Sequence, residues 1–266
     1  MLSKSKIEIE KYKMLISAMP EDKAIEATEM LKEAMKDGAE TSKTLPKINK
    51  FVMQNANVYI VKDENEIEGK DLTKYDLVMF DCDVKDVTDF SNCPKKMIFN
   101  RHIDWYGKDF KKLPDLFGAI VCGYFDCHGC NNLESLEGAP KEVGGGFYCG
   151  DCNNLTSLTG APEKVRSGFV CYHCNNLTSL EGAPKKVGGN FDCSRCENLE
   201  SLVGAPEKVR KSFDCRGCYN LTSAKGLPMH IGGEIKCDDE LRPEIDKELE
   251  KRNKQFKLPS YFGHEW

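Results

Sequence analysis

The cysteines are the residues whose types and spacing most directly suggest chemistry. Fourteen cysteines occur in 266 residues, and ten of them form C-x-x-C pairs that recur every 22 residues. Two neighbouring pairs could supply four thiolates to a zinc ion, and a single pair could carry out thiol–disulfide exchange. The five pairs are Cys127 and Cys130, Cys149 and Cys152, Cys171 and Cys174, Cys193 and Cys196, and Cys215 and Cys218.

A second candidate for chemistry is the D-x-D sequence formed by Asp81 and Asp83 after an apolar run. It is similar to the nucleophile motif of haloacid-dehalogenase-like phosphatases. The same F-D-C letters recur in later units without a second aspartate, and the lysine and distal acids of such a site have no clear position. The five histidines fall into no nucleophile or metal motif. A phosphatase-like enzyme is therefore the weaker alternative.

A 22-residue repeat must position the cysteines. From Phe125 the skeleton F-x-C-x-x-C-x-N-L-x-S-L-x-G-A-P-x-x-V occurs in five successive units, and a sixth begins at Ile235. Alternate residues of a strand face the same side, so Phe191 and Cys193 should point inward and Asp192 outward. One unit cannot bury its own apolar side, and stacked units can. The residues expected to complete the inner lining are Leu199, Leu202, Ala205 and Val209, with Gly204 and Pro206 turning the chain.

The repeat resembles the leucine-rich-repeat family, in particular the short cytosolic arrays of bacterial and bacteriophage proteins. Its period lies within the family range of about 20 to 29 residues. The resemblance places Phe191 and Cys193 on the strand and Cys196 on the ladder position. Phenylalanine and cysteine stand where leucine is usual. The family resemblance implies a curved solenoid that recognises proteins through its concave face.

The expected fold class is therefore α+β: a leucine-rich-repeat solenoid with one parallel strand in each 22-residue rung and an irregular or 3-10 back face. Residues 1–76 are expected to form a helical N-terminal domain with a short strand, acting as a cap or docking domain. Residues 77–239 form the solenoid, with irregular rungs over 77–124, one of them carrying an insertion, and five regular rungs over 125–234. In the first of these, Phe80-Asp81-Cys82 is matched to the repeat strand. Residues 240–266 form a C-terminal cap with a charged helix over 242–254, against which Leu258, Tyr261, Phe262 and Trp266 pack.

Two predictions concern the inside of each rung. The cysteines occupy positions that the fold requires to be apolar, five pairs leave one unmatched, and no basic residue regularly accompanies them. Buried structural thiols are therefore favoured over zinc, because cysteine is a small and often buried hydrophobe. An asparagine precedes a core leucine in every unit and is expected to form a stacked hydrogen-bonded ladder. These residues are Asn132, Asn154, Asn176, Asn198 and Asn220.

The outward strand positions vary between units, whereas the framework does not. The middle rungs present aromatic residues and the later rungs present mixed charge, a composition typical of protein interfaces. The alternative is that these are ordinary solvated residues. The predicted binding residues on the concave face are His128, Tyr148, Asp151, Val170, Tyr172, His173, Asp192, Arg195, Asp214 and Arg216.

Composition and charge exclude several functional classes. The net charge of −5 is spread thinly, and no segment forms the basic stripe of a nucleic-acid-binding protein. No apolar stretch has the length of a membrane span, and the N-terminus lacks the apolar core of a signal peptide. Many cysteines without a secretion signal indicate a reducing compartment, so we expect a cytoplasmic protein.

Together these features predict a non-enzymatic protein-binding module with no cofactor, no metal, and no nucleic-acid or membrane partner. The protein partner and the oligomeric state stay undefined, and a host-interaction factor of a phage or bacterium fits this prediction. One alternative is a structural or assembly protein that oligomerises through its N-terminal helices. The other is a zinc-binding protein or phosphatase-like enzyme.

Overall fold

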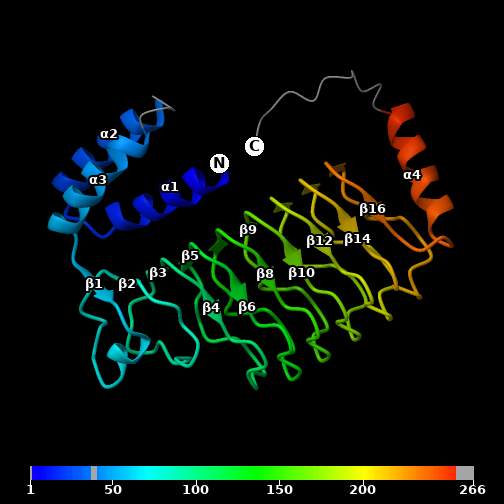
Figure 1. The fold of residues 1–266 in the computed structure, drawn as a ribbon, viewed down its shortest axis with the longest axis horizontal. Coiled ribbons are helices and arrows are strands. Elements are labelled where there is room, and N and C mark those ends of the chain that lie inside the picture. The colour runs from blue at the N-terminus through cyan, green and yellow to red at the C-terminus, as the bar shows by residue number, and fades with distance from the viewer. Residues whose placement is uncertain (1, 37–40, 256–266) are drawn as a thin grey trace.

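The chain forms a parallel β-solenoid of about eight turns, preceded by three α-helices and followed by one (Figure 1). The structure is a computed structural model that describes residues 2–36 and 41–255. Within that part of the chain, no helix combines the length and apolar character needed to cross a membrane. The coils advance by 22 residues along most of the stack, so the repeat seen in the sequence is the structural unit.

Each regular rung contributes two short strands, not the single strand expected, and these build two sheets. The second strand arises because the residues before each conserved valine are also extended and bond to the adjacent coil. The nine-stranded sheet consists of β1 (Val58–Val61), β2 (Leu77–Phe80), β3 (Met97–Phe99), β5 (Ile120–Val121), β7 (Glu142–Val143), β9 (Lys164–Val165), β11 (Lys186–Val187), β13 (Lys208–Val209) and β15 (His230–Ile231). The seven-stranded sheet consists of β4 (Ile103–Asp104), β6 (Phe125–Asp126), β8 (Phe147–Tyr148), β10 (Phe169–Val170), β12 (Phe191–Asp192), β14 (Phe213–Asp214) and β16 (Ile235–Lys236).

The core of the solenoid is a set of ladders, each made by one repeat position. Phe147 and Phe169 stack with ring centroids 5.3 Å apart and planes 7° apart, and the same contact continues along the stack. Phe191 and Cys193 are fully buried, as expected, and Asp192 lies between them on the outside. The remaining lining positions are also as expected: Leu199, Leu202 and Val209 are fully buried and Ala205 is partly buried.

The turn opposite the sheets depends on one glycine per rung. Gly204 has a φ of +88°, and a Cβ there would lie 2.4 Å from the backbone of Glu181 in the preceding rung. A side chain would therefore be excluded both by conformation and by the close approach of neighbouring coils. The rest of this back face consists of turns, in which Leu199 N donates to Cys196 O and Ala205 N donates to Leu202 O. The expectation of an irregular back face is confirmed.

The first rungs differ from the prediction in register. Ile103 pairs with Phe125 and Ile98 pairs with Ile120, each across 22 residues, so the rung over 97–124 contains no insertion. Phe80 lies in the nine-stranded sheet opposite Phe99, whereas the repeat phenylalanines lie in the other sheet. Matching Phe80-Asp81-Cys82 to the repeat strand was therefore wrong. The letters agreed, but the apolar run before them pairs with the valine strands.

The N-terminal helices cover one side of the stack and do not close its end as we expected. They are α1 (Leu2–Ile16), α2 (Glu21–Lys36) and α3 (Thr41–Asn55). Their apolar side chains pack on Leu77, Met79 and Ile98 of β2 and β3. Both faces of these strands are apolar, so their outer face needs a cover. The 3-10 helix η1 (Glu64–Ile67) instead contributes the buried Ile67 to the start of the solenoid core.

The C-terminal helix α4 (Arg242–Gln255) covers the last rung. Ile245 is fully buried in the solenoid core, and the Arg252 guanidinium donates to the carbonyl oxygens of Leu227 and Pro228 at 2.7 and 2.8 Å. The arginine thus satisfies backbone groups that no further rung can reach. The four aromatic and apolar residues expected to pack near this helix, Leu258, Tyr261, Phe262 and Trp266, lie outside the described residues.

Candidate functional site

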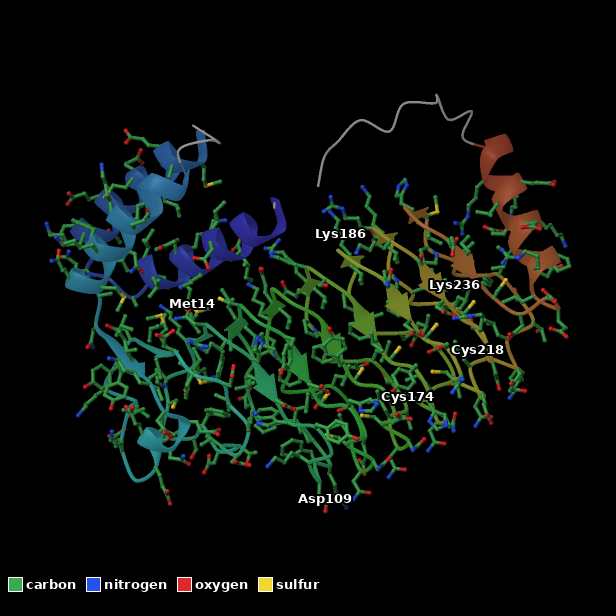
Figure 2. All side chains as sticks on the ribbon, in the orientation of Figure 1. Met14, Asp109, Cys174, Lys186, Cys218 and Lys236 are labelled. Carbon is green, nitrogen blue, oxygen red and sulfur yellow. The ribbon has the colours of Figure 1, made fainter. Side chains whose placement is uncertain are left out.

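The cysteine pairs form a hydrogen-bonded ladder inside the solenoid. The second thiol of each pair donates to the backbone carbonyl of the residue at the first-cysteine position of the preceding rung: Cys152 to Cys127, Cys174 to Cys149 and Cys196 to Cys171, each over 3.2 Å. Burial raises the pKa of Cys196 to about 12, which disfavours a reactive thiolate. All fourteen cysteines are free thiols, and Figure 2 labels Cys174 and Cys218 within the stack.

This arrangement bears on the zinc alternative and on the asparagine ladder. Among the residues that the structure describes, no three His, Cys, Asp or Glu side chains are grouped so as to hold a metal ion. The asparagine ladder is wrong, because all five asparagines are exposed. Only Asn198 and Asn220 bond to each other, over 3.3 Å. The cysteine thiols instead bond the inner carbonyl groups, because they point inward.

The two aspartates of the D-x-D sequence hold the neighbouring rung. Asp81 accepts from the Asn100 amide at 3.2 Å, and Asp83 accepts from the backbone N–H of His102 at 3.1 Å. Both residues are exposed. Each carboxylate therefore has a structural partner in the next coil.

The outer side of the seven-stranded sheet carries all ten predicted binding residues. Tyr148, Val170, Asp192 and Asp214 lie in the strands β8, β10, β12 and β14, and the other six lie in the turn that follows each strand. In each rung, three outward positions two residues apart form a row across the sheet. Parallel pairing in register places each row about 4.8 Å from the next, so that equivalent residues form columns along the stack.

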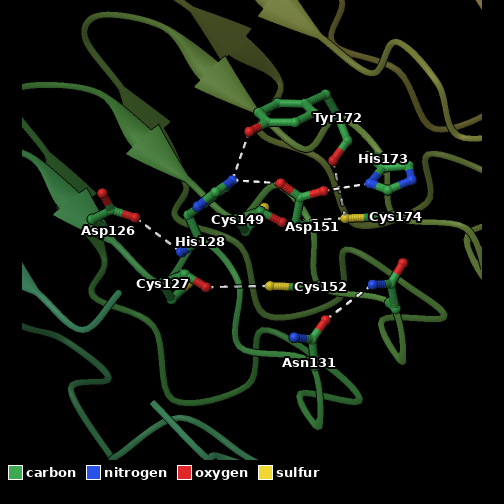
Figure 3. Close-up of polar contacts among 11 residues, drawn as sticks. Asp126, Cys127, His128, Asn131, Cys149, Asp151, Cys152, Tyr172, His173 and Cys174 are labelled. Carbon is green, nitrogen blue, oxygen red and sulfur yellow. Dashed lines mark hydrogen bonds and ion pairs between the residues drawn. The ribbon is translucent and has the colours of Figure 1, made fainter. Parts of the chain in front are cut away.

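Four of the predicted residues form one polar network (Figure 3). His128 Nε2 lies 2.7 Å from Asp151 Oδ2 and 2.6 Å from the Tyr172 hydroxyl, and His173 Nδ1 bonds the other oxygen of Asp151. The carboxylate accepts from both rings, so this geometry places a proton on His128 Nε2 and on His173 Nδ1. The two histidines are two rungs apart, and Asp151 in the intervening rung joins them.

The network shifts the pKa values of Asp151 and Tyr172. Burial raises the pKa of Asp151, but hydrogen bonds from His173, Tyr172 and His128 outweigh it, and the pKa is lowered overall. Burial and the Asp151 carboxylate raise the pKa of Tyr172. At neutral pH, Asp151 is therefore an anion that orients a tyrosine hydroxyl and two imidazole rings.

Backbone conformation at the network is unusual. Asp151, His173 and Arg195 have φ values of 51°, 55° and 58°, and the equivalent positions in the flanking rungs are Gly129 and Gly217. A left-handed conformation costs a residue with a side chain about 1–2 kcal/mol, although Asp and His tolerate it better than most. Three successive rungs thus place a side chain where the fold favours glycine.

Gly150 gives Tyr172 access to His128. A Cβ on Gly150 would lie 2.8 Å from the Tyr172 ring and 3.1 Å from the His128 ring. The absent side chain lets the tyrosine extend back over one rung to the histidine of the rung before. The Tyr172 ring therefore occupies the space above Gly150, and the hydrogen bond to His128 holds its hydroxyl group in place.

Sequence reasoning missed the first row of this face, which consists of His102, Asp104 and Tyr106, together with Tyr124 in the next row. His102 stacks on Tyr124 with ring centroids 3.9 Å apart, and Tyr106 stacks on His128 at 5.2 Å. The signal was present: Ile103-Asp104 stands 22 residues before Phe125-Asp126. The expected insertion in this rung hid it.

The later rungs do not join the network. Asp214 forms an ion pair with Arg216 over 2.5 Å, and Arg195 is exposed. A separate open groove of about 780 Å³ lies at the start of the solenoid, lined by residues that include Lys70, Asp71 and Asp86. It lies on the loops of residues 65–73 and 86–92, away from the network.

Comparison with known proteins found no match for this chain among the family models, the curated proteins or the solved structures.

Proposed function

We propose that this protein binds a protein partner through the outer face of the seven-stranded sheet. The observation that carries the proposal is the run of three non-glycine residues in left-handed conformation at Asp151, His173 and Arg195. Backbone strain of this kind is concentrated at functional sites, where surrounding contacts hold it in place. Stability alone would favour glycine at all three positions, as in the flanking rungs.

The side chains held by this backbone support binding to a protein. Tyr148 and Tyr172 present half-buried aromatic rings on this face, and the network of His128, Asp151 and His173 limits the motion of Tyr172, whose hydroxyl group bonds His128. Tyrosines that are already fixed lose little conformational freedom on binding and are frequent hot-spot residues. A broad sheet face with aromatic residues and mixed charge has the composition of a protein interface.

The test is a comparative capture experiment with quantitative mass spectrometry. The double variant Tyr148→Ala/Tyr172→Ala removes two rings from the proposed face. The matched control, Phe117→Ala/Tyr219→Ala, removes two rings that are 78% and 76% exposed in turns outside it. We expect at least one protein to be retained by the wild type and the control and lost from the tyrosine variant. Identical sets of captured proteins from all three would refute the proposal.

A further inference from the structure

The first two rows of the seven-stranded sheet form an acidic surface between aromatic walls. The rows are His102, Asp104 and Tyr106 in one rung, and Tyr124, Asp126 and His128 in the next. Asp104 pairs in register with Asp126, so the two residues are neighbours on strands about 4.8 Å apart. We call this surface the aromatic–acidic patch; it also includes Tyr148 and Tyr172 from the following rungs.

The next two rungs extend both aromatic walls toward the carboxylates. A Cβ on Gly146 would lie 2.4 Å from the Tyr148 hydroxyl, so the tyrosine lies over this glycine, and its ring meets Tyr124 edge to face at 6.2 Å. On the other side, Tyr172 crosses Gly150 and its ring lies 5.5 Å from that of His128. Glycines at both positions thus let two tyrosines lean back toward the aspartates.

The two carboxylates have unused hydrogen-bonding capacity. Asp104 accepts from the backbone N–H of Tyr106 at 3.3 Å, and Asp126 accepts from that of His128 at 2.8 Å, in each case through Oδ1. Across the described residues, Oδ2 of neither aspartate has a hydrogen bond or ion pair. Burial raises the pKa of Asp126, and the charge of Asp104 raises it further. A cation placed between them would favour the charged form of both carboxylates, offsetting the cost of desolvation and the repulsion.

We propose that the aromatic–acidic patch binds the guanidinium group of an arginine side chain presented by a partner polypeptide. This inference rests on the proposed function, since it names what the partner brings to that face. A guanidinium can donate to both Oδ2 atoms at once, because its five N–H groups are arranged as a fork. Its flat faces also stack on tyrosine and histidine rings.

Charge and shape favour arginine over other ligands. The six residues of the two rows include no lysine or arginine that could neutralise Asp104 and Asp126. A lysine ammonium is a compact, strongly hydrated charge that cannot stack on rings as a guanidinium does. The patch is an open sheet face, so the arginine must come from an extended or protruding segment of another chain.

The experiment uses the full-length protein and four synthetic peptides of glycine and serine that differ only at the central residue. That residue is arginine, lysine, citrulline or alanine, and citrulline keeps the shape of arginine without its charge. Binding is followed by amide chemical shifts in two-dimensional NMR. We expect arginine to bind best, with shifts in the rungs of residues 102–128, and citrulline to bind at least about tenfold more weakly.

Two variants locate the binding. Asp104→Asn/Asp126→Asn keeps the Oδ1 acceptors of both turns and should weaken arginine binding by about tenfold or more. Asp115→Asn changes an exposed carboxylate in the same kind of turn outside the seven-stranded sheet, where Asp115 accepts from Phe117 N at 3.0 Å, and should leave arginine binding unchanged. Thermal unfolding of each variant confirms that it is folded.

Several results would overturn the assignment: equal binding of the arginine and citrulline peptides, equal binding of arginine and lysine, or equal losses in Asp115→Asn and the double variant. These outcomes are separable from failure of the proposed function. If a captured protein still depends on Tyr148 and Tyr172 while no arginine peptide binds, the face is a docking surface and the arginine assignment is wrong. If arginine peptides bind the patch and capture does not depend on the tyrosines, the docking proposal is wrong.

Discussion

Arg195 offers a direct measurement of the backbone strain on which the proposed function depends. Its φ is 58°, its side chain is exposed, and the same position in the next rung is Gly217 at φ 72°. Replacement by alanine keeps the left-handed strain of about 1–2 kcal/mol, whereas glycine removes it and adds about 0.5–1 kcal/mol of unfolded-state entropy. The expected difference is that Arg195→Gly is more stable than Arg195→Ala by about 1 kcal/mol.

The assay is urea unfolding followed by circular dichroism. The unfolding free energies of the two variants are compared with the same dependence on urea concentration for both. A repeat protein can unfold in parts, so hydrogen exchange of the amides in rungs 171–218 should report the same difference locally. The control is Glu197, an exposed residue two positions later whose φ is not in the left-handed region. There the order should reverse, with alanine more stable than glycine. The same order at both positions would refute the idea that strain is stored at this face.

Two further predictions concern the ladder and the network. Cys174→Ala should lower the unfolding free energy by about 2 kcal/mol, because it removes a buried sulfur and its hydrogen bond to Cys149 O. Cys174→Ser should lose less, because its hydroxyl group can keep that hydrogen bond. Equal losses of the two variants in urea unfolding would contradict a role for the hydrogen bond. The pH dependence of stability should have opposite signs at two aspartates, as thermal unfolding between pH 2 and pH 7 can show. The folded-state pKa of Asp151 is lowered, so its contribution is present above the unfolded pKa of about 3.9 and is lost as the pH falls through the folded pKa; Asp151→Asn should therefore destabilise at pH 7 and not at pH 2. The pKa of Asp126 is raised, so its ionisation opposes folding, and Asp126→Asn should stabilise the protein at pH 7 but not at low pH. A change in stability of the same sign in both variants at pH 7 would refute the assigned environments.

The sequence predicted the solenoid because its evidence is local and repeated. Phe191, Cys193 and Leu199 recur at fixed offsets in successive units, and inward and outward positions follow from strand alternation. Two expectations failed where local letters were ambiguous. Asn198 could bond inward or face water, and the pattern alone did not decide between them. Phe80-Asp81-Cys82 matched the repeat in letters, but pairing with the adjacent coil placed it in the other sheet.

The candidate site was predictable residue by residue but not as an arrangement. His128, Asp151 and Tyr172 were each expected on the binding face, and their separation along the chain gave no reason to join them. Their bonds depend on side-chain reach over a glycine and on a left-handed turn, which are properties of three stacked rungs together. The row of His102, Asp104 and Tyr106 was missed for a related reason, since only strand pairing showed that its rung is a regular one.

What the sequence determined by itself is the repeating unit: its length, its inward residues and the positions that vary. Each of these follows from interactions within one coil, where spacing along the chain equals position in space. The tertiary structure alone decided which variable residues meet, because residues 22 apart become neighbours only when coils stack. The thiol ladder, the network around Asp151 and the paired carboxylates of Asp104 and Asp126 all arise at that level.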